Sequence, residues 1–451
     1  MLMERYSLDI LQDALRRLEK GFQGLPEFTP SVETGALRNV LLEVAERMKD
    51  NYPYPHPMYI GQMMKPPHPI ARLAYALTLW INPNNHALDG GRASSAMEKE
   101  AVAELASMFG WKTHLGHLCS GGTIANLEAL WIAGNLNPGK KVIASQQAHY
   151  THERICGVLK LPFEFIPCDS QAHMDLDALK ALLAEGDIGT VVVTIGTTAT
   201  GSVDPLPEIL KLQSQHDFRI HADAAYGGFF ILVDNLDPET LSTFQCLSDV
   251  DSIVIDPHKH GLQPYGCGCV LFKDPAVGRF YKHDSPYTYF SSNELHLGEI
   301  SLECSRPGAS AVALWATQRL HPFVPGGKLA SDLKKSRKAA IKLFEMLQND
   351  SRFMATLTPE LDIVVWAPKA KRASEVSYLS KAIFEAAAAE DLHMAIANLP
   401  CSLFMDHWKG IQWDQDDVTC LRSCLMKPEH LEWIGHIWQA LDLATNRVLN
   451  K

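Results

Sequence analysis

The stretch at residues 253–261, IVIDPHKHG, decides the fold, because an apolar run of strand type delivers a single lysine, Lys259, into a turn. A second short apolar run at residues 220–228, IHADAAYGG, delivers an acid, Asp223, in the same way. Ligands of open α/β sheets bind outside the carboxyl ends of the strands. The two stretches therefore predict a functional site at one edge of such a sheet.

A lysine and an aspartate in these positions match the needs of pyridoxal 5′-phosphate (PLP). The lysine forms a Schiff base with the cofactor aldehyde, and the acid holds a proton on the pyridine nitrogen, so that the ring acts as an electron sink. A single loop lysine is usually exposed, and an aspartate often caps a helix or joins a salt bridge. The prediction of PLP therefore depends on Lys259 and Asp223 lying together.

The pattern of the central region predicts the fold class. Short β-branched runs alternate with amphipathic stretches, which is typical of an α/β fold with a doubly wound, mostly parallel seven-stranded sheet. The candidate strands are residues 113–118, 141–145, 163–167, 190–195, 218–222, 252–255 and 267–272. Too few residues separate the last two for a helical crossover, so one of them is expected to be antiparallel.

The sequence HPFVPGGK, which ends at Lys328, marks a break between domains. We predict an N-terminal helical segment at residues 1–60, a large PLP-binding domain at residues 61–325 and a small C-terminal α+β domain at residues 326–451. The first segment is expected to pack on a second subunit. The elements predicted after the break are a long helix at residues 329–349, strands at 362–366, 394–398 and 418–425, and a closing helix at 428–448.

Composition narrows the class of protein. The 451 residues carry a net charge of -11, which argues against nucleic acid and anionic membranes as main partners. No apolar stretch is long enough for a spanning helix, and residues 1–20 lack the apolar core of a secretory signal. The ten cysteines show no CxxC spacing, which predicts reduced thiols in a cytoplasmic protein and no zinc or other metal site.

Three further segments follow predicted strands. SGGT at residues 120–123 offers glycines and a helix start to a phosphate, although the motif taken alone more often marks a turn with an N-cap. His149, in residues 147–152 (QAHYTH), could stack on a pyridine ring or be a polar loop histidine. The hydroxyls of residues 194–198 (TIGTT) could contact the ring substituents or cap a turn. Five such segments at successive strand ends favour one shared site.

The stretches HPMYIG, SSAMEKEAVAELASMFGW, SGGTIANLEAL, QQAHYT, TIGTTATG, HADAAYGG and DPHKHG resemble the group II PLP-dependent amino acid decarboxylases of fold type I. This family holds the aromatic amino acid, glutamate, tyrosine and histidine decarboxylases. The resemblance runs from about His56 to Gly308, and more loosely to the C-terminus. It implies α-decarboxylation of a small-molecule L-amino acid to the amine and CO2 by a homodimer.

The resemblance also implies site residues. Lys259 is the Schiff-base lysine, Asp223 pairs with the ring nitrogen, Ala225 lies under the ring, and His149 stacks on its other face. The further contacts that it implies are Gly122 and Thr123 at the phosphate, His258 beside them, Thr198 at the ring substituents, and His56 and Tyr59 in the substrate pocket. The residues Asp256 and His260 depart from the family pattern, and an acid at position 256 would repel the phosphate unless it is paired.

The sequence does not decide the roles of four further residues. A loop tyrosine of the family returns a proton to the α-carbon, and Tyr287 and Tyr289 are both candidates here, although they could equally be packing residues. His149 is an alternative proton donor. Arg306, in CSRPG at residues 304–308, could bind a substrate acid or a phosphate, and is equally consistent with a structural salt bridge. The orientation of Arg422 does not follow from the sequence.

Other activities fit parts of the pattern. DPHKHG followed by SRPG also resembles C–C lyases of the sphingosine-phosphate type, and an aminotransferase would use the same lysine and aspartate. A protein that binds PLP without turnover is disfavoured, because both Lys259 and Asp223 are present. A decarboxylase is the function that the sequence favours.

Overall fold

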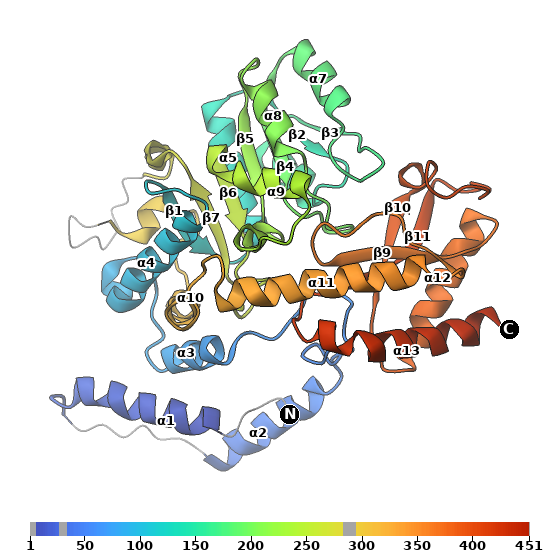
Figure 1. Cartoon of the computed structure of the whole chain (residues 1–451). Helices are drawn as coiled ribbons and strands as arrows, with labels where there is room; N and C mark the ends of the chain where they lie inside the picture. Colours follow the sequence, from blue (N-terminus) through green and yellow to red (C-terminus); the bar gives the residue numbers. More distant parts are fainter. Residues whose placement is uncertain (1–5, 27–33, 283–294, 451) are drawn as a thin grey trace.

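The computed structural model describes residues 6–26, 34–282 and 295–450, and its strands form two separate sheets (Figure 1). The larger sheet has seven strands in the order β1-β7-β6-β5-β4-β2-β3. Its strands are β1 (Leu115–Cys119), β2 (Lys141–Ser145), β3 (Phe163–Ile166), β4 (Ile188–Thr194), β5 (Arg219–Asp223), β6 (Ser252–Ile255) and β7 (Gly268–Phe272). All seven predicted strands are present, with ends shifted by one or two residues.

Strand direction confirms the predicted sheet. The pairs β3/β2, β2/β4, β4/β5 and β5/β6 are parallel, whereas β7 is antiparallel to both β6 and β1. The short connection between β6 and β7 cannot hold a crossover helix, so β7 returns in the opposite direction. The carboxyl ends of the other strands therefore meet at one edge of the sheet.

Both faces of the large sheet are covered, which explains the near-continuous apolar runs of its strands. Val142, Val192, Val254 and Val270 face α5 (Gly122–Leu136) and α6 (Thr151–Leu159). The alternate residues of the strands pack on the opposite face in the main core. The helices with side chains in that core include α4 (Arg92–Met108), α7 (Leu176–Glu185), α8 (Leu206–Gln213) and α9 (Pro238–Gln245).

The smaller sheet is antiparallel, with the order β10-β11-β9-β8. Its strands are β8 (Phe353–Met354), β9 (Ile363–Pro368), β10 (Ala395–Pro400) and β11 (Asp417–Cys424). The apolar faces of α11 (Lys328–Gln348), α12 (Ala373–Ala388) and α13 (His430–Leu449) form a second core with it around the buried Trp366. The helix α12 and the strand β8 were not among the predicted elements. The predicted domain boundaries remain a prediction.

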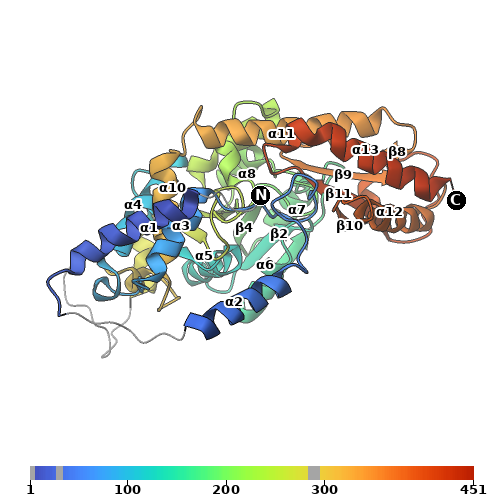
Figure 2. The same cartoon turned by 90° about the horizontal axis from the view of Figure 1, so that it is seen from below.

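The N-terminal helices lie at one side of the molecule (Figures 1 and 2). The helix α1 (Tyr6–Glu19) contacts α3 (Pro69–Leu79), which packs on α10 (Gly308–Leu320). The helix α2 (Thr34–Met48) has no buried residue, although it carries several large apolar side chains. Within the described ranges, no helix is both long and apolar enough to cross a bilayer.

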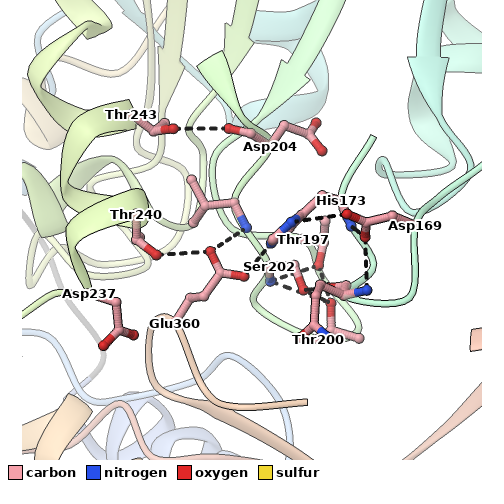
Figure 3. Close-up of polar contacts among 12 residues, drawn as sticks. Asp169, His173, Thr197, Thr200, Ser202, Asp204, Asp237, Thr240, Thr243 and Glu360 are labelled. Carbon is pink, nitrogen blue, oxygen red and sulfur yellow. Dashed lines mark hydrogen bonds and ion pairs between the residues drawn. The ribbon is translucent and has the colours of Figure 1, made fainter. Parts of the chain in front are cut away.

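A polar network joins the two sheets beneath the loop that follows β4 (Figure 3). His173 lies between two carboxylates, with Nε2 2.6 Å from Glu360 Oε1 and Nδ1 3.5 Å from Asp169 Oδ2. Glu360, just before β9, also accepts hydrogen bonds from Thr240 and from the backbone N–H of Val203. The network therefore ties the small sheet to the segment at residues 197–203, which carries Thr198.

We expect His173→Gln to lower the free energy of unfolding by about 2 kcal/mol at pH 6, because two charge-assisted contacts are lost. Burial alone would lower the pKa of His173, but hydrogen bonds and charges from Asp169 and Glu360 outweigh it and raise the pKa to about 10. The pKa of His173 is therefore higher in the folded protein than in the unfolded one. The stabilisation is therefore complete below about pH 6.5 and is lost as the pH rises towards 10.

Denaturant unfolding of both proteins from pH 6 to pH 10 measures this effect. His216→Gln, at a partly exposed position outside the network, is the control. A difference between His173→Gln and the parent that stays constant with pH would contradict the assigned pKa.

Candidate functional site

Side chains from five strand ends line a cavity of about 390 Å³ at the carboxyl edge of the large sheet. It lies where ligands of doubly wound sheets bind. The sequence-predicted residues among its lining are Gly122, Thr123, His149, Thr198, Asp223, Ala225, His258 and Lys259. The structure thus brings together all the residues that were expected to contact PLP.

Lys259 follows β6 and turns its ammonium group into this cavity. Its Nζ lies 3.4 Å from Asp256 Oδ2, and His258 Nε2 lies 3.5 Å from the same oxygen. Asp256 is 2% exposed, so its charge would be unfavourable without the Lys259 ammonium group and the His258 ring beside it. The acid that departs from the family pattern is therefore paired, and it does not stand as an isolated negative charge beside the cavity.

Asp223, the last residue of β5, is held by three donors. Its Oδ2 accepts from His152 Nε2 at 2.9 Å and from Asn126 Nδ2 at 3.3 Å, and its Oδ1 accepts from the backbone N–H of Ala225. Burial alone would raise the pKa of Asp223, but the hydrogen bond and charge of His152 and the charge of Lys259 hold it well below its usual range. The carboxylate therefore stays ionised within the cavity.

The start of α5 forms the cavity wall that suits an anion. Gly121 has φ +156°, a backbone conformation that favours glycine, and α5 begins at Gly122. A Cβ atom on Gly122 would lie 2.8 Å from Asp256 Oδ2, so only glycine fits there. The first N–H groups of a helix have no partner within it and carry the positive end of its dipole.

The remaining lining also fits PLP. Thr194 Oγ1, at the end of β4, is buried without a hydrogen-bond partner among the described residues and lines the cavity. His149 donates or accepts at Nδ1 with Thr151 Oγ1, 2.8 Å away, and burial lowers its pKa. A neutral imidazole is a suitable flat partner for a pyridine ring. The cavity thus offers PLP an ionised acid, a lysine, a helix start and a hydroxyl group without a hydrogen-bond partner. These groups match the functional groups of the cofactor.

A second cavity of about 570 Å³ shares His149 and Thr198 with the first and extends to the small sheet. Arg422, on β11, is 4% exposed and lines this cavity. Its Nη1 donates to Gln62 Oε1 at 3.3 Å, whereas its Nε and Nη2 atoms are buried without a partner in the described chain. The arginine therefore offers two unused donors beside the cofactor cavity.

Four predicted residues are placed elsewhere or lie outside the described ranges. Arg306 is 6% exposed and pairs with Glu98 at 2.8 Å behind β1, so the structure favours a salt bridge over the predicted contact with substrate. His56 is exposed and its ring packs against Trp433. Tyr287 and Tyr289 lie in residues 283–294, outside the description. Tyr59 is buried outside both cavities, and its hydroxyl oxygen accepts from the backbone N–H of Gln62, whose side chain contacts Arg422.

Sequence reasoning missed the residues that surround Asp223. Asn126 Oδ1 contacts His221 Nε2 at 2.8 Å, and His221 Nδ1 contacts Ser252 Oγ at 2.9 Å, so a buried polar chain runs from β6 to Asp223. Asn126 and His152 stand within the motifs SGGTIAN and QAHYTH, three residues after Thr123 and His149. Thr123 and Asn126 lie one turn apart on α5, which was an available signal that they face the same site, whereas His149 precedes the helix α6 that carries His152.

Comparison with known proteins identifies the decarboxylase family that the sequence motifs resemble. Residues 135–369, more than half of the chain, match the pyridoxal-dependent decarboxylase conserved domain. A "Probable L-tyrosine/L-aspartate decarboxylase" of Methanothermobacter thermautotrophicus is 31% identical over 263 residues, which cover 58% of this chain and 70% of that protein. An "L-tyrosine decarboxylase" of Enterococcus faecium is 28% identical, and the match covers 63% of each protein.

The crystal structure of the Oryza sativa TDC protein with PLP and tryptamine superposes with a TM-score of 0.78. The two sequences are 16% identical, and the superposition covers 98% of this chain and 96% of the rice protein. At this sequence identity, the similarity between the two proteins shows a common fold. The fold of this chain is therefore fold type I. The domain match and the relatives show that the chain belongs to the pyridoxal-dependent decarboxylase family, as an amino acid decarboxylase with PLP as its cofactor.

Proposed function

We propose that this decarboxylase acts on an L-amino acid with an acidic side chain, and that Arg422 binds the side-chain carboxylate. The observation that carries the proposal is the pair of unused donors, Nε and Nη2, on a buried arginine beside the cofactor cavity. A buried guanidinium without an anion is unfavourable, and its planar fork suits a carboxylate. The names of the relatives include aspartate as well as tyrosine, which is consistent with this substrate class.

Arg422 is better suited to bind the side-chain carboxylate, which the product keeps, than the α-carboxylate, which leaves as CO2. The α-carboxylate departs as neutral CO2, so a cation that grips it would stabilise the substrate more than the transition state. A side-chain carboxylate keeps its charge throughout the reaction. Arg422 can therefore orient the substrate without raising the barrier.

We propose that the residues of the cofactor cavity have the roles that the sequence predicts. PLP, when bound, supplies a protonated ring that accepts the electron pair left by CO2. Asp223 holds the proton at the ring nitrogen, and its ionisation is maintained by His152 and Asn126. Lys259 attaches the cofactor. The N–H groups of Gly122 and Thr123, with His258, hold its phosphate.

His149 and Ala225 confine the ring in this proposal, and Thr198 contacts its substituents. The lowered pKa of His149 leaves its imidazole neutral at pH 7. Such a group is a better ring partner than a proton donor. Tyr287 and Tyr289 therefore remain our candidates for the residue that returns a proton to the α-carbon.

We expect Arg422→Met to lower kcat/KM for the best acidic amino acid by about 100-fold, because a buried charge-assisted contact is lost. Activity on a panel that includes aspartate, glutamate, tyrosine and tryptophan is followed by release of CO2 and amine. Arg447→Met, at an exposed salt bridge on α13, is the matched control and should behave as the parent. If the parent prefers an aromatic substrate, or if Arg422→Met keeps its activity on acids, the assigned substrate class is wrong.

A homodimer is also part of the proposal. The apolar side chains of α2 that are largely exposed are Leu37, Val40, Leu41, Leu42, Val44 and Met48. Six such residues on one helix are more than a monomer normally leaves in water, and a second copy of the chain would cover them. Light scattering of the purified protein tests this, and a monomeric mass at micromolar concentration would contradict it.

We propose a cytoplasmic location. All ten cysteines are free, and most of them are buried. A protein that matures in an oxidising compartment more often carries disulfides. Cell fractionation with an activity assay checks the location, and recovery of the enzyme outside the cytoplasm would contradict it.

A further inference from the structure

A third cavity, of about 410 Å³, lies on a different part of the molecule and shares no lining residue with the cofactor cavity. Five parts of the chain enclose it: the N-terminal strap at residues 55–69, Leu262, His321, the start of α11, and residues 426–429 before α13. Neither the decarboxylation chemistry nor the proposed substrate contact uses this cavity. Its lining, however, is rich in cationic groups.

Lys65 is the most informative of these groups. It lines the cavity and forms no hydrogen bond or ion pair with the part of the chain that the structure describes. Burial lowers its pKa to about 8, despite the attraction of Asp362. A lysine that is partly buried and lacks a counter-ion within hydrogen-bond distance is unfavourable, and a bound anion would reduce that cost.

Lys427 supplies a second ammonium group from another element. It is 3% exposed, its Nζ donates to the backbone oxygen of Tyr59 at 2.7 Å, and burial together with the charge of Lys65 lowers its pKa to about 7. An ammonium group has three donors, so this contact leaves Lys427 capacity for a ligand. Both lysines line the cavity, and the charge of Lys65 disfavours the charged form of Lys427.

The other ionisable groups that line the cavity offset the charge of these lysines only in part, since Asp332 and Glu429 attract Lys65 and Glu429 attracts Lys427. Lys328 and Asp332 pair with each other one turn apart on α11. His68 and His321 face each other with Nε2 atoms 3.2 Å apart, which makes one of them a donor and one an acceptor. Glu429 is exposed at the rim. The described lining therefore has a surplus of positive charge, which disfavours a metal ion.

We propose that this cavity binds a small dianion, either a phosphate or a dicarboxylate, with Lys65 and Lys427 as its charge partners. The volume exceeds the needs of chloride and suits a compact organic or inorganic dianion. Lysine acts as a point charge and does not require the planar geometry of a carboxylate. Both dianions therefore share the chemistry that the cavity recognises.

The position of the cavity connects it to the cofactor site. The backbone N–H of His68 donates to the oxygen of Leu262, which lies three residues after Lys259 and has φ +66°. Asp362, whose charge attracts Lys65, accepts a 2.6 Å hydrogen bond from Tyr226, the neighbour of Ala225. A dianion in the cavity would thus contact the strap that holds the loop of the cofactor lysine.

Calorimetric titration of the holoenzyme with inorganic phosphate and, separately, with succinate tests the proposal at constant ionic strength. The bound cofactor occupies its own phosphate site, and the titrations are repeated with Arg422→Met, so that succinate at the proposed substrate site is not counted. We expect saturable binding of at least one dianion. Lys65→Met should weaken it at least tenfold, or about 1.4 kcal/mol, whereas Lys65→Arg should retain it.

Lys342→Met removes an exposed lysine of the same helix, α11, outside the cavity, and should leave the affinity unchanged. Binding of phosphate alone, succinate alone or both supports the proposal, provided that Lys65→Met weakens it, and identifies the ligand class. Absence of saturable binding by both dianions overturns the proposal, and so does an affinity that is indifferent to Lys65→Met. Retained visible absorbance of the cofactor verifies that the Lys65 variants are folded holoenzymes.

Discussion

Lys259→Ala is expected to abolish the visible absorbance of the cofactor–lysine linkage and to lower kcat by at least about 1,000-fold, because the side chain that attaches the cofactor is lost. The structure adds a specific reason to expect a folded variant. Asp256 loses Lys259 but keeps His258 3.5 Å away, so the buried acid is not left wholly unpaired. Absorbance spectra and amine release measure the two effects.

Lys273→Ala is the matched control, since Lys273 is exposed just beyond β7. It should retain both the absorbance and the turnover of the parent. If Lys259→Ala keeps the colour and the activity, the lysine is misassigned, whatever the state of the rest of the cavity.

Asp223→Ala is expected to lower kcat by about 100-fold or more, while the affinity for PLP falls by less than tenfold. The charge of the acid matters most when the ring accepts electrons, so its loss affects the transition state more than the bound cofactor. Equilibrium binding of PLP and single-turnover rates separate these two quantities. The absorbance spectrum of the holoenzyme should also change, because the ring nitrogen loses its anionic partner.

Asp249→Ala, which removes an exposed acid, controls for a general loss of negative charge. Equal and small losses in rate and affinity for Asp223→Ala would contradict the assigned role. Loss of binding without loss of rate per bound cofactor would assign Asp223 to anchoring alone.

The fold could be predicted because its signals are local. Apolar runs that end in IHADAAYGG and IVIDPHKHG specify strands followed by polar turns, and parallel strands bring such turns to one edge. The seven strands, the reversed β7 and the cavity around Lys259 and Asp223 therefore agree with the sequence. The helix α12 was missed because the sequence alone did not separate it from the strand-like runs around it.

The sequence by itself predicted which residues line the candidate cofactor cavity, because each of them lies at or just after a strand end that is recognisable from its own neighbours. The tertiary structure alone decided which residues support that site. His152 reaches Asp223, Gln62 reaches Arg422, and Arg306 turns to Glu98. These contacts join segments distant in the chain, so they depend on how the helices and the second sheet pack, which no local pattern records.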